Sequence, residues 1–139
     1  MQVTLLEGFE NMQMEEATAL LQTSNWSPGI GLQEVVQATK NSALVVGAFV
    51  EGRQVGFLRV ISDKTRFAYF NDVIVNEQFR HRGIATQMVN YALRHETLKD
   101  VYQWMLRTTY ARGFYETLGF AELPEPEKFM AIFRPRPDR

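Results

Sequence analysis

The chain contains no cysteine in 139 residues, which excludes disulfide bonds, thiolate metal ligands and cysteine nucleophiles. Histidine is almost as scarce: His81 and His95 are the only two, so we expect no metal site. No apolar run approaches the ~18 residues that a membrane span needs. The N-terminus lacks a basic start and a long apolar stretch, so we expect no signal peptide and a cytoplasmic location.

Neither sign of charge dominates the sequence. The 15 Lys and Arg residues against 16 Asp and Glu residues give a net charge of -1. Such a chain has no general field that attracts nucleic acid or an anionic membrane, so we expect neither as a partner. The only feature that favours nucleic acid is a set of arginines without interleaved aromatic residues, namely Arg80, Arg82, Arg134, Arg136 and Arg139.

Hydrophobic periodicity changes along the chain from helical to strand-like and back, as expected of a mixed α/β fold. The length fits one domain, here residues 1–139. We expect a mixed, mostly antiparallel central sheet of about six to seven strands flanked by about four helices. Strands are predicted at 2–6, 43–50, 55–61, 66–75, 101–108 and 127–133, and helices at 11–21, 32–40, 83–95 and 111–120.

Residues 73–88, VIVNEQFRHRGIATQM, carry the strongest chemical signal. A predicted strand leads through a loop with two arginines to a glycine that opens a helix. The first amides of a helix lack acceptors and lie at the positive end of its dipole, so they can hold an anion. The alternative is an ordinary strand-to-helix turn with surface arginines. The Rossmann and Walker A glycine patterns are both absent.

RHRGIA at 80–85 resembles the acyl-CoA motif of the GNAT superfamily, Q/R-x-x-G-x-G/A, with Arg80, Gly83 and Ala85 in the specified places. Downstream, ARGFYETLGF at 111–120 resembles the second signature of that family, and the two motifs come in the family's order. The resemblance covers residues 43–120 well. It implies a GNAT-like sheet that is splayed between the strands at 66–75 and 102–108, with acetyl-CoA as cosubstrate between them.

The resemblance also implies roles for particular residues. The backbone near Val73 would pair with the pantetheine arm, and the amides of the 80–85 loop would hold the pyrophosphate. Tyr115 would protonate the departing CoA thiolate; the alternative is a core tyrosine. Thr108 occupies the position where many members carry an asparagine, and its hydroxyl could still form a hydrogen bond there. The implied cofactor-binding residues are Val73, Ile74, Val75, Arg80, His81, Arg82, Gly83, Ile84, Ala85 and Thr108.

Transfer to an amine needs a base or a water chain that removes a proton from the nucleophile. Asp72, a carboxylate inside an apolar strand, is the best-placed candidate. The alternative is a structural acceptor for backbone amides or for an arginine such as Arg107. Trp26, Ser42 and Phe70 are the candidates for the lining of an acceptor pocket. Trp26 could instead anchor its loop, residues 24–31, to the core.

These observations favour an N-acetyltransferase that moves an acetyl group from acetyl-CoA to a primary amine by direct attack in a ternary complex. The lack of cysteine argues against an acetyl-enzyme on a thiol. A non-catalytic acyl-CoA-binding sensor is the alternative, since it needs the anion loop but neither Tyr115 nor Asp72. Pairing of an exposed last strand between two copies would give a homodimer.

Overall fold

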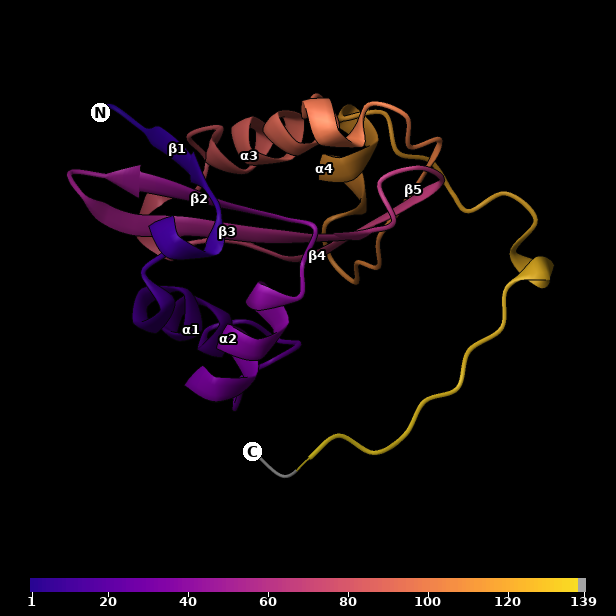
Figure 1. The fold of residues 1–139 in the computed structure, drawn as a ribbon, viewed down its shortest axis with the longest axis horizontal. Coiled ribbons are helices and arrows are strands. Elements are labelled where there is room, and N and C mark those ends of the chain that lie inside the picture. The colour runs from indigo at the N-terminus through magenta and orange to yellow at the C-terminus, as the bar shows by residue number, and fades with distance from the viewer. Residues whose placement is uncertain (138–139) are drawn as a thin grey trace. The chain divides into compact units, whose positions relative to one another are not determined.

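The computed structural model describes residues 1–137, so Arg139 lies outside the described residues. The chain divides into two compact units, Met1–Leu106 and the residues from Arg107 onward. Within residues 1–137 it forms five strands and four α-helices (Figure 1). None of the helices in this range has the length and apolar character needed to cross a bilayer.

The five strands belong to the first unit and form one sheet in the order β1-β2-β3-β4-β5. The pairs β1–β2, β2–β3 and β3–β4 are antiparallel, and β5 runs parallel to β4. A parallel neighbour needs a crossover, which the helix between β4 and β5 provides, as predicted. The strands are β1 (Thr4–Glu7), β2 (Leu44–Val50), β3 (Arg53–Ser62), β4 (Phe67–Val75) and β5 (Gln103–Met105).

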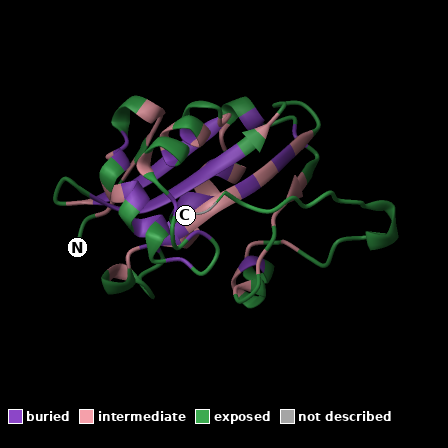
Figure 2. Cartoon of the chain, turned by 90° about the horizontal axis from the view of Figure 1, so that it is seen from below, coloured by how far each residue is buried: buried purple, intermediate pink, exposed green. Residues whose placement is uncertain are grey.

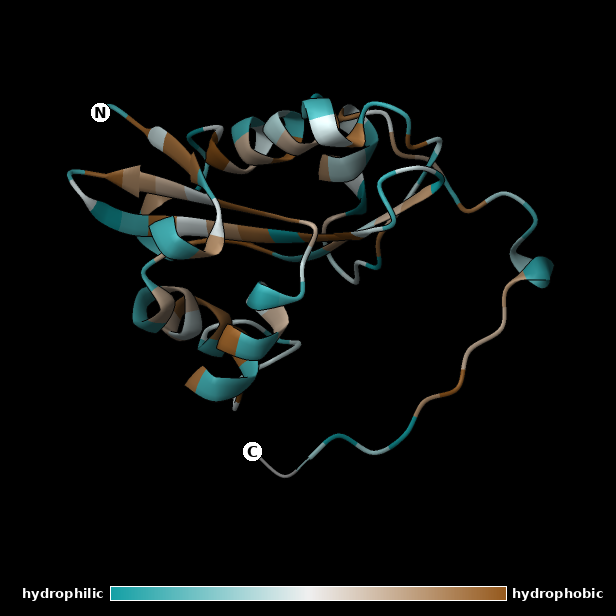
Figure 3. Cartoon of the chain, viewed as in Figure 1, coloured by the Kyte–Doolittle hydropathy of each residue, from teal (hydrophilic) through white to brown (hydrophobic). Residues whose placement is uncertain are grey.

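Helices cover both faces of this sheet. Helices α1 (Met14–Gln22) and α2 (Leu32–Lys40) lie on one face, and α3 (Ile84–Leu93) lies on the other (Figure 1). Burial on both faces explains why β2 and β3 read as continuous apolar runs rather than as alternating ones (Figures 2 and 3). Short 3₁₀ helices occupy Phe9–Asn11, Glu77–Phe79, Glu96–Leu98 and Pro126–Lys128.

Two sequence predictions about the sheet were wrong. It has five strands in the described residues, not six or seven, and 127–133 forms no strand there. The residues of that segment have the side chains of a strand, but a strand exists only where a neighbour accepts and donates its hydrogen bonds. Instead Met130 is 99% exposed and Ile132 is 80% exposed. The predicted strand 101–108 shrinks to β5 for the same reason, because its pairing stops early.

The second unit contains α4 (Arg112–Thr117), which ends as its glycine predicts. Gly119 has φ 101°, and its N–H donates to the carbonyl of Glu116 at 3.1 Å. The next amide, Phe120 N–H, donates to the carbonyl of Tyr115 at 3.1 Å, and the rings of Phe120 and Tyr115 meet edge-on at 5.8 Å. This is a Schellman ending with its usual hydrophobic contact, and it holds Tyr115 in the last turn of the helix.

A reciprocal pair of glutamines attaches the start of α1 to the β2–β3 hairpin. The backbone N–H of Gln13 donates to Gln54 Oε1 at 2.8 Å, and the backbone N–H of Gln54 donates to Gln13 Oε1 at 2.9 Å. Gln54 is fully buried, and its Nε2 also donates to the carbonyl of Gly56 at 3.0 Å. This attachment fixes the helix whose C-terminal end begins the loop at 24–31.

We expect Gln54→Leu to lower the free energy of unfolding by about 1–3 kcal/mol, because the partly buried N–H of Gln13 and the carbonyl of Gly56 lose the partners that Gln54 provides. Urea unfolding measures the change. Gln33→Leu, on the exposed side of α2, is the control and should change the free energy by less than about 0.5 kcal/mol. Equal stability of the Gln54 variant and the wild type would contradict the attachment.

Candidate cofactor and active site

Strand β4 has a neighbour on its β5 side for only part of its length. The parallel pairing runs from Phe67↔Gln103 through Ala68↔Trp104 to Tyr69↔Met105 and then stops, whereas β4 continues to Val75. The later residues of β4 therefore have no β5 backbone to pair with. Unpaired strand groups need another partner, either water or an extended ligand with its own amides.

A β-bulge bends β4 within this unpaired stretch. Phe57 pairs with Ile74 but Arg59 pairs with Asn71, so the single residue between them on β3 lies opposite both Asp72 and Val73. Asp72 has φ 57°, in the left-handed region. Such a bulge increases the local twist and changes the direction of the strand, here just before residues 73–75.

A pocket of about 320 Å³ lies at the bulged end of β4. Residues 73–75 form one wall, the loop residues 23–26 after α1 form another, and Arg80 completes it. The structure thus brings four of the predicted cofactor-binding residues into one pocket with the predicted acceptor residue Trp26. Sequence reasoning missed the contribution of Thr23, Ser24 and Asn25, which only the packing of the loop against β4 reveals.

The loop after β4 presents unpaired amides at the start of α3. The first helical hydrogen bond runs from Gln87 N–H to the carbonyl of Gly83 at 3.0 Å, so the amides of Ile84, Ala85 and Thr86 precede it. Gly83 has φ 77°, and a side chain at this position would be strained although it would meet no atom within 4 Å. The open space and the dipole of α3 make this end of the helix suitable for an anion.

The two arginines of the loop have different partners. Arg80 Nε donates to the carbonyl of Val75 at 3.2 Å and so ties the loop to the end of β4. Arg82 lies over the ring of Phe79 at 5.5 Å, and its Nη1 donates to Met1 Sδ at 3.2 Å. His81 is exposed and has φ 63°. Within residues 1–137 neither guanidinium forms an ion pair with a carboxylate, so both charges remain available to an anion.

Asp72 forms an ion pair with Arg59 rather than with Arg107. Arg59 Nε donates to Asp72 Oδ2 at 2.8 Å, and the two side chains are only 10% and 9% exposed. The other oxygen, Oδ1, accepts from Trp26 Nε1 at 3.3 Å. Arg59 Nη1 also donates to Ser42 Oγ at 3.1 Å, so one hydrogen-bond network joins three of the predicted site residues, Asp72, Trp26 and Ser42. Sequence reasoning missed Arg59, although a lone charge inside VGFLRVI was a usable signal.

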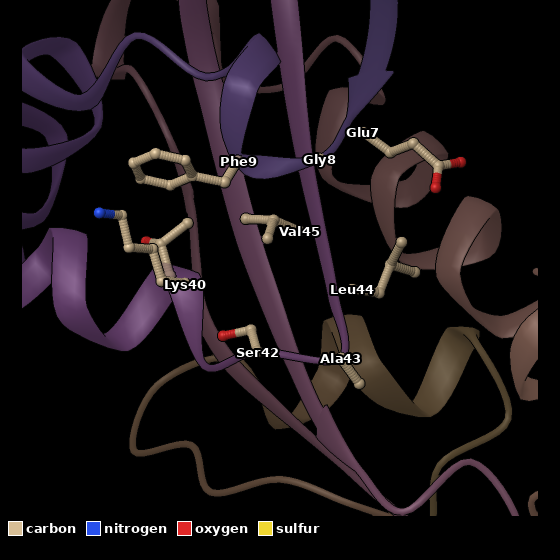
Figure 4. A pocket seen from close by; sticks show the side chains of 9 residues that line it. Glu7, Gly8, Phe9, Lys40, Ser42, Ala43, Leu44 and Val45 are labelled. Carbon is tan, nitrogen blue, oxygen red and sulfur yellow. The ribbon is translucent and has the colours of Figure 1, made fainter.

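The three residues predicted to line an acceptor pocket do not share one. Ser42 lies in a second pocket of about 210 Å³, together with Lys40 and Phe9, whose ring lies 5.1 Å from the Lys40 ammonium (Figure 4). Phe70 pairs with Val60, the residue after Arg59, and therefore points to the opposite face of the sheet from Arg59. There it stacks on Trp104, with ring centroids 5.4 Å apart.

The second unit holds the predicted acid and Thr108. Tyr115 is buried, and this burial raises the pKa of its phenol to about 12. Its ring packs against Phe114 at 4.9 Å as well as against Phe120. Thr108 Oγ1 accepts from the N–H of Ala111, the N-cap residue of α4, at 3.0 Å, and its own hydroxyl proton can still be donated.

Away from this region, Glu7 joins β1 to the end of α3. The hydroxyl of Tyr91 donates to Glu7 Oε1, and His95 Nε2 lies 2.9 Å from the same oxygen. The bond from Tyr91 is the main cause that lowers the pKa of Glu7; burial opposes it and His95 adds to it. The described residues contain no group of three His, Cys, Asp or Glu side chains that could hold a metal ion.

Comparison with known proteins identifies the family. The family model described as an acetyltransferase (GNAT) domain matches residues 41–122. A crystal structure of an acetyltransferase assigned to the GNAT family, from Xanthomonas campestris pv. campestris, is 31% identical, with a TM-score of 0.90 over 97% of this chain and 95% of that one. The chain therefore belongs to the GNAT family, and it is an acyl-CoA-dependent acetyltransferase.

More distant structures share the fold. A GNAT family protein from Streptococcus pneumoniae TIGR4 is 23% identical, with a TM-score of 0.75 over 99% of this chain and 100% of that one. The aminoglycoside N-acetyltransferase AAC(6')-Iy, solved in complex with CoA, is 16% identical, with a TM-score of 0.73 over 97% of this chain and 95% of that one. None of the curated proteins compared with this chain matches it.

The raised pKa of Tyr115 predicts a dependence of stability on alkaline pH. The pKa of Tyr115 in the folded protein, about 12, exceeds the ordinary value of about 10. Its contribution to the free energy of unfolding is therefore complete below pH ~10 and is lost as the pH rises toward 12. Tyr115→Phe should therefore lose stability less steeply than the wild type over this range, as measured by urea unfolding at a series of pH values.

The exposed Tyr110 provides the matched control for this titration, because it is 85% exposed. Tyr110→Phe should follow the wild-type pH profile. If the Tyr115 and Tyr110 variants lose stability equally steeply, burial does not shift the pKa of the Tyr115 phenol.

Proposed function

We propose that this enzyme transfers an acetyl group from acetyl-CoA to the primary amine of an acceptor by direct attack in a ternary complex. One observation carries the proposal. A single pocket combines the part of β4 that lacks a β5 partner with Arg80, three residues before the glycine that opens α3. An extended, amide-containing arm with a diphosphate at one end matches these two features together.

For the cosubstrate, residues 73–75 supply backbone groups that pair with the amides of the pantetheine arm. The amides of the 81–85 loop hold the pyrophosphate, and Arg80 and Arg82 add positive charge. The neighbouring structure that contains CoA supports this choice of cosubstrate, since it shares the fold over 97% of the chain. Thr108 is proposed to donate a hydrogen bond from its hydroxyl group to the cosubstrate.

Tyr115 is proposed as the general acid. Acyl transfer releases CoA as a thiolate, which takes up a proton before it leaves. With a pKa of about 12, the phenol is protonated at neutral pH and can hydrogen-bond to the departing thiolate, while the burial that raises its pKa makes it a weaker acid than an exposed tyrosine. The alternative, a purely structural tyrosine, is supported by its packing against Phe114 and Phe120.

For the base, the contacts of Asp72 support its structural role. Each carboxylate oxygen already accepts one hydrogen bond, one from Arg59 and the other from Trp26. We therefore propose that a water molecule accepts the amine proton and passes it to solvent. Trp26, which lines the pocket and is 40% exposed, is proposed to contact the acceptor.

The deciding experiment combines binding with turnover. Isothermal titration with acetyl-CoA should give a saturable heat, and a panel of amines, amino acids and peptides should include one that yields an acetylated product and free CoA. Binding without turnover on any amine would instead support the sensor. The absence of acetyl-CoA binding at high micromolar concentration would overturn both the acetyltransferase proposal and the sensor alternative.

Ala85→Glu tests the anion site. We choose Ala85 because it lies inside α3, where glutamate keeps its ordinary backbone conformation, whereas Gly83 has φ 77° and would be strained. The added carboxylate lies beside the first amides and repels a pyrophosphate, so acetyl-CoA binding should fall below detection by calorimetry while the melting temperature is retained. Gln87→Glu, on an exposed position of the same helix, should bind nearly as the wild type does. Wild-type affinity of a folded Ala85 variant would place the pyrophosphate elsewhere.

Tyr115→Phe tests the acid. Removing the hydroxyl should lower kcat by roughly 10²–10⁴-fold, the usual contribution of a positioned acid, with little change in acetyl-CoA affinity. Tyr110→Phe is the control and should keep wild-type kcat. A folded Tyr115 variant with wild-type turnover would leave the residue with its structural role alone.

A further inference from the structure

We propose that Arg59 is a positioning residue for acetyl-CoA. Through Asp72 it holds the β4 bulge in the conformation that presents residues 73–75 to the pantetheine arm. The inference rests on the proposed function, since it assigns this strand edge to pantetheine. Arg59 itself lies on β3 and is not among the residues that line the pocket.

The bulge contains a backbone conformation that needs support. Asp72 has φ 57°, which is unfavourable for a residue with a side chain, although aspartate tolerates it better than most. Such a conformation persists only when the surrounding structure fixes it. Its neighbours in the ladder, Arg59↔Asn71 and Phe57↔Ile74, hold the strand on both sides of the bulge but do not pair with Asp72 itself.

The side chain of Asp72 supplies the missing support. Arg59 holds one carboxylate oxygen at 2.8 Å, and Trp26 holds the other at 3.3 Å. Arg59 is itself fixed, because its Nη1 donates to Ser42 Oγ at 3.1 Å and lies 3.4 Å from the carbonyl of Ala38 in α2. The bulge is thus tied to α2 and to the loop that forms the opposite wall of the pocket.

The position of the bulge determines which part of the cosubstrate it affects. Val73 immediately follows Asp72 and is the first β4 residue of the pocket wall. Rotation of the backbone at Asp72 would therefore turn the strand edge that faces pantetheine. The amides proposed for the pyrophosphate belong to α3 and to the loop before it, whereas the hydrogen bonds of Arg59 go to Asp72, Ala38 and Ser42. Loss of Arg59 should weaken the pantetheine contacts selectively.

The test compares two ligands on the full-length protein by isothermal titration. One is acetyl-CoA, and the other is 3′-phosphoadenosine 5′-diphosphate, which is the nucleotide part without pantetheine. Arg59→Met should weaken the affinity for acetyl-CoA by at least about tenfold, as expected for losing one or two hydrogen bonds. Its affinity for the nucleotide should stay within about twofold of the wild-type value. The control is Arg53→Met on the same strand, whose ion pair with Glu16 is 57% and 41% exposed; it should leave both affinities unchanged.

A second variant keeps the inference testable if Arg59→Met fails to fold because it leaves the buried Asp72 charge unpaired. Arg59→Met combined with Asp72→Asn removes both charges and keeps a side chain at φ 57° that needs support, so this variant should fold and show the same selective loss. Wild-type affinity for acetyl-CoA in a folded variant, or equal weakening of both ligands, would overturn the inference. Failure of the wild type to bind either ligand would instead overturn the proposed function.

Discussion

The site depends on the point at which β4 loses its neighbour. Beyond Tyr69 no residue of β5 pairs with β4, so the backbone of residues 73–75 offers donors and acceptors on a side where a sheet would normally satisfy them. A sheet interior with unpaired groups is costly unless water or a ligand completes it. In the proposed function the completing ligand is acetyl-CoA, whose pantetheine arm contains two amides in an extended chain. On this proposal the fold builds half of a strand pair and the cosubstrate supplies the other half.

In the same proposal, charge fixes the orientation of the cosubstrate. The N-terminal amides of α3 begin next to the end of β4, because the loop of residues 76–83 is short and Arg80 binds the carbonyl of Val75. A negative diphosphate at this end places the rest of the arm along the strand. The buried Arg59–Asp72 pair contributes no net charge, which suits a structural role beside the proposed amine site.

Much of this arrangement could be predicted from the sequence, because local signals determine it. Glycine at 83, the apolar runs of β2 and β3 and the glycine after α4 each point to one local conformation, and all three are found. Predictions that depended on tertiary partners did worse. The segment 127–133 has strand-forming side chains without a strand neighbour, and no local signal predicts the bulge at Asp72. Arg59 is the lone charge inside an apolar strand, but the local sequence does not show which side chain would pair with it, so its role was missed.

The most direct test of this account is hydrogen exchange of the backbone amides with and without acetyl-CoA. The account predicts slower exchange on binding in two separate segments, residues 73–75 of β4 and residues 81–86 at the start of α3. Peptides from β1 and from the β2–β3 turn serve as internal references and should exchange at unchanged rates. Saturating acetyl-CoA that protects the α3 segment but leaves residues 73–75 unchanged would contradict the central claim that the cosubstrate completes the open edge of β4.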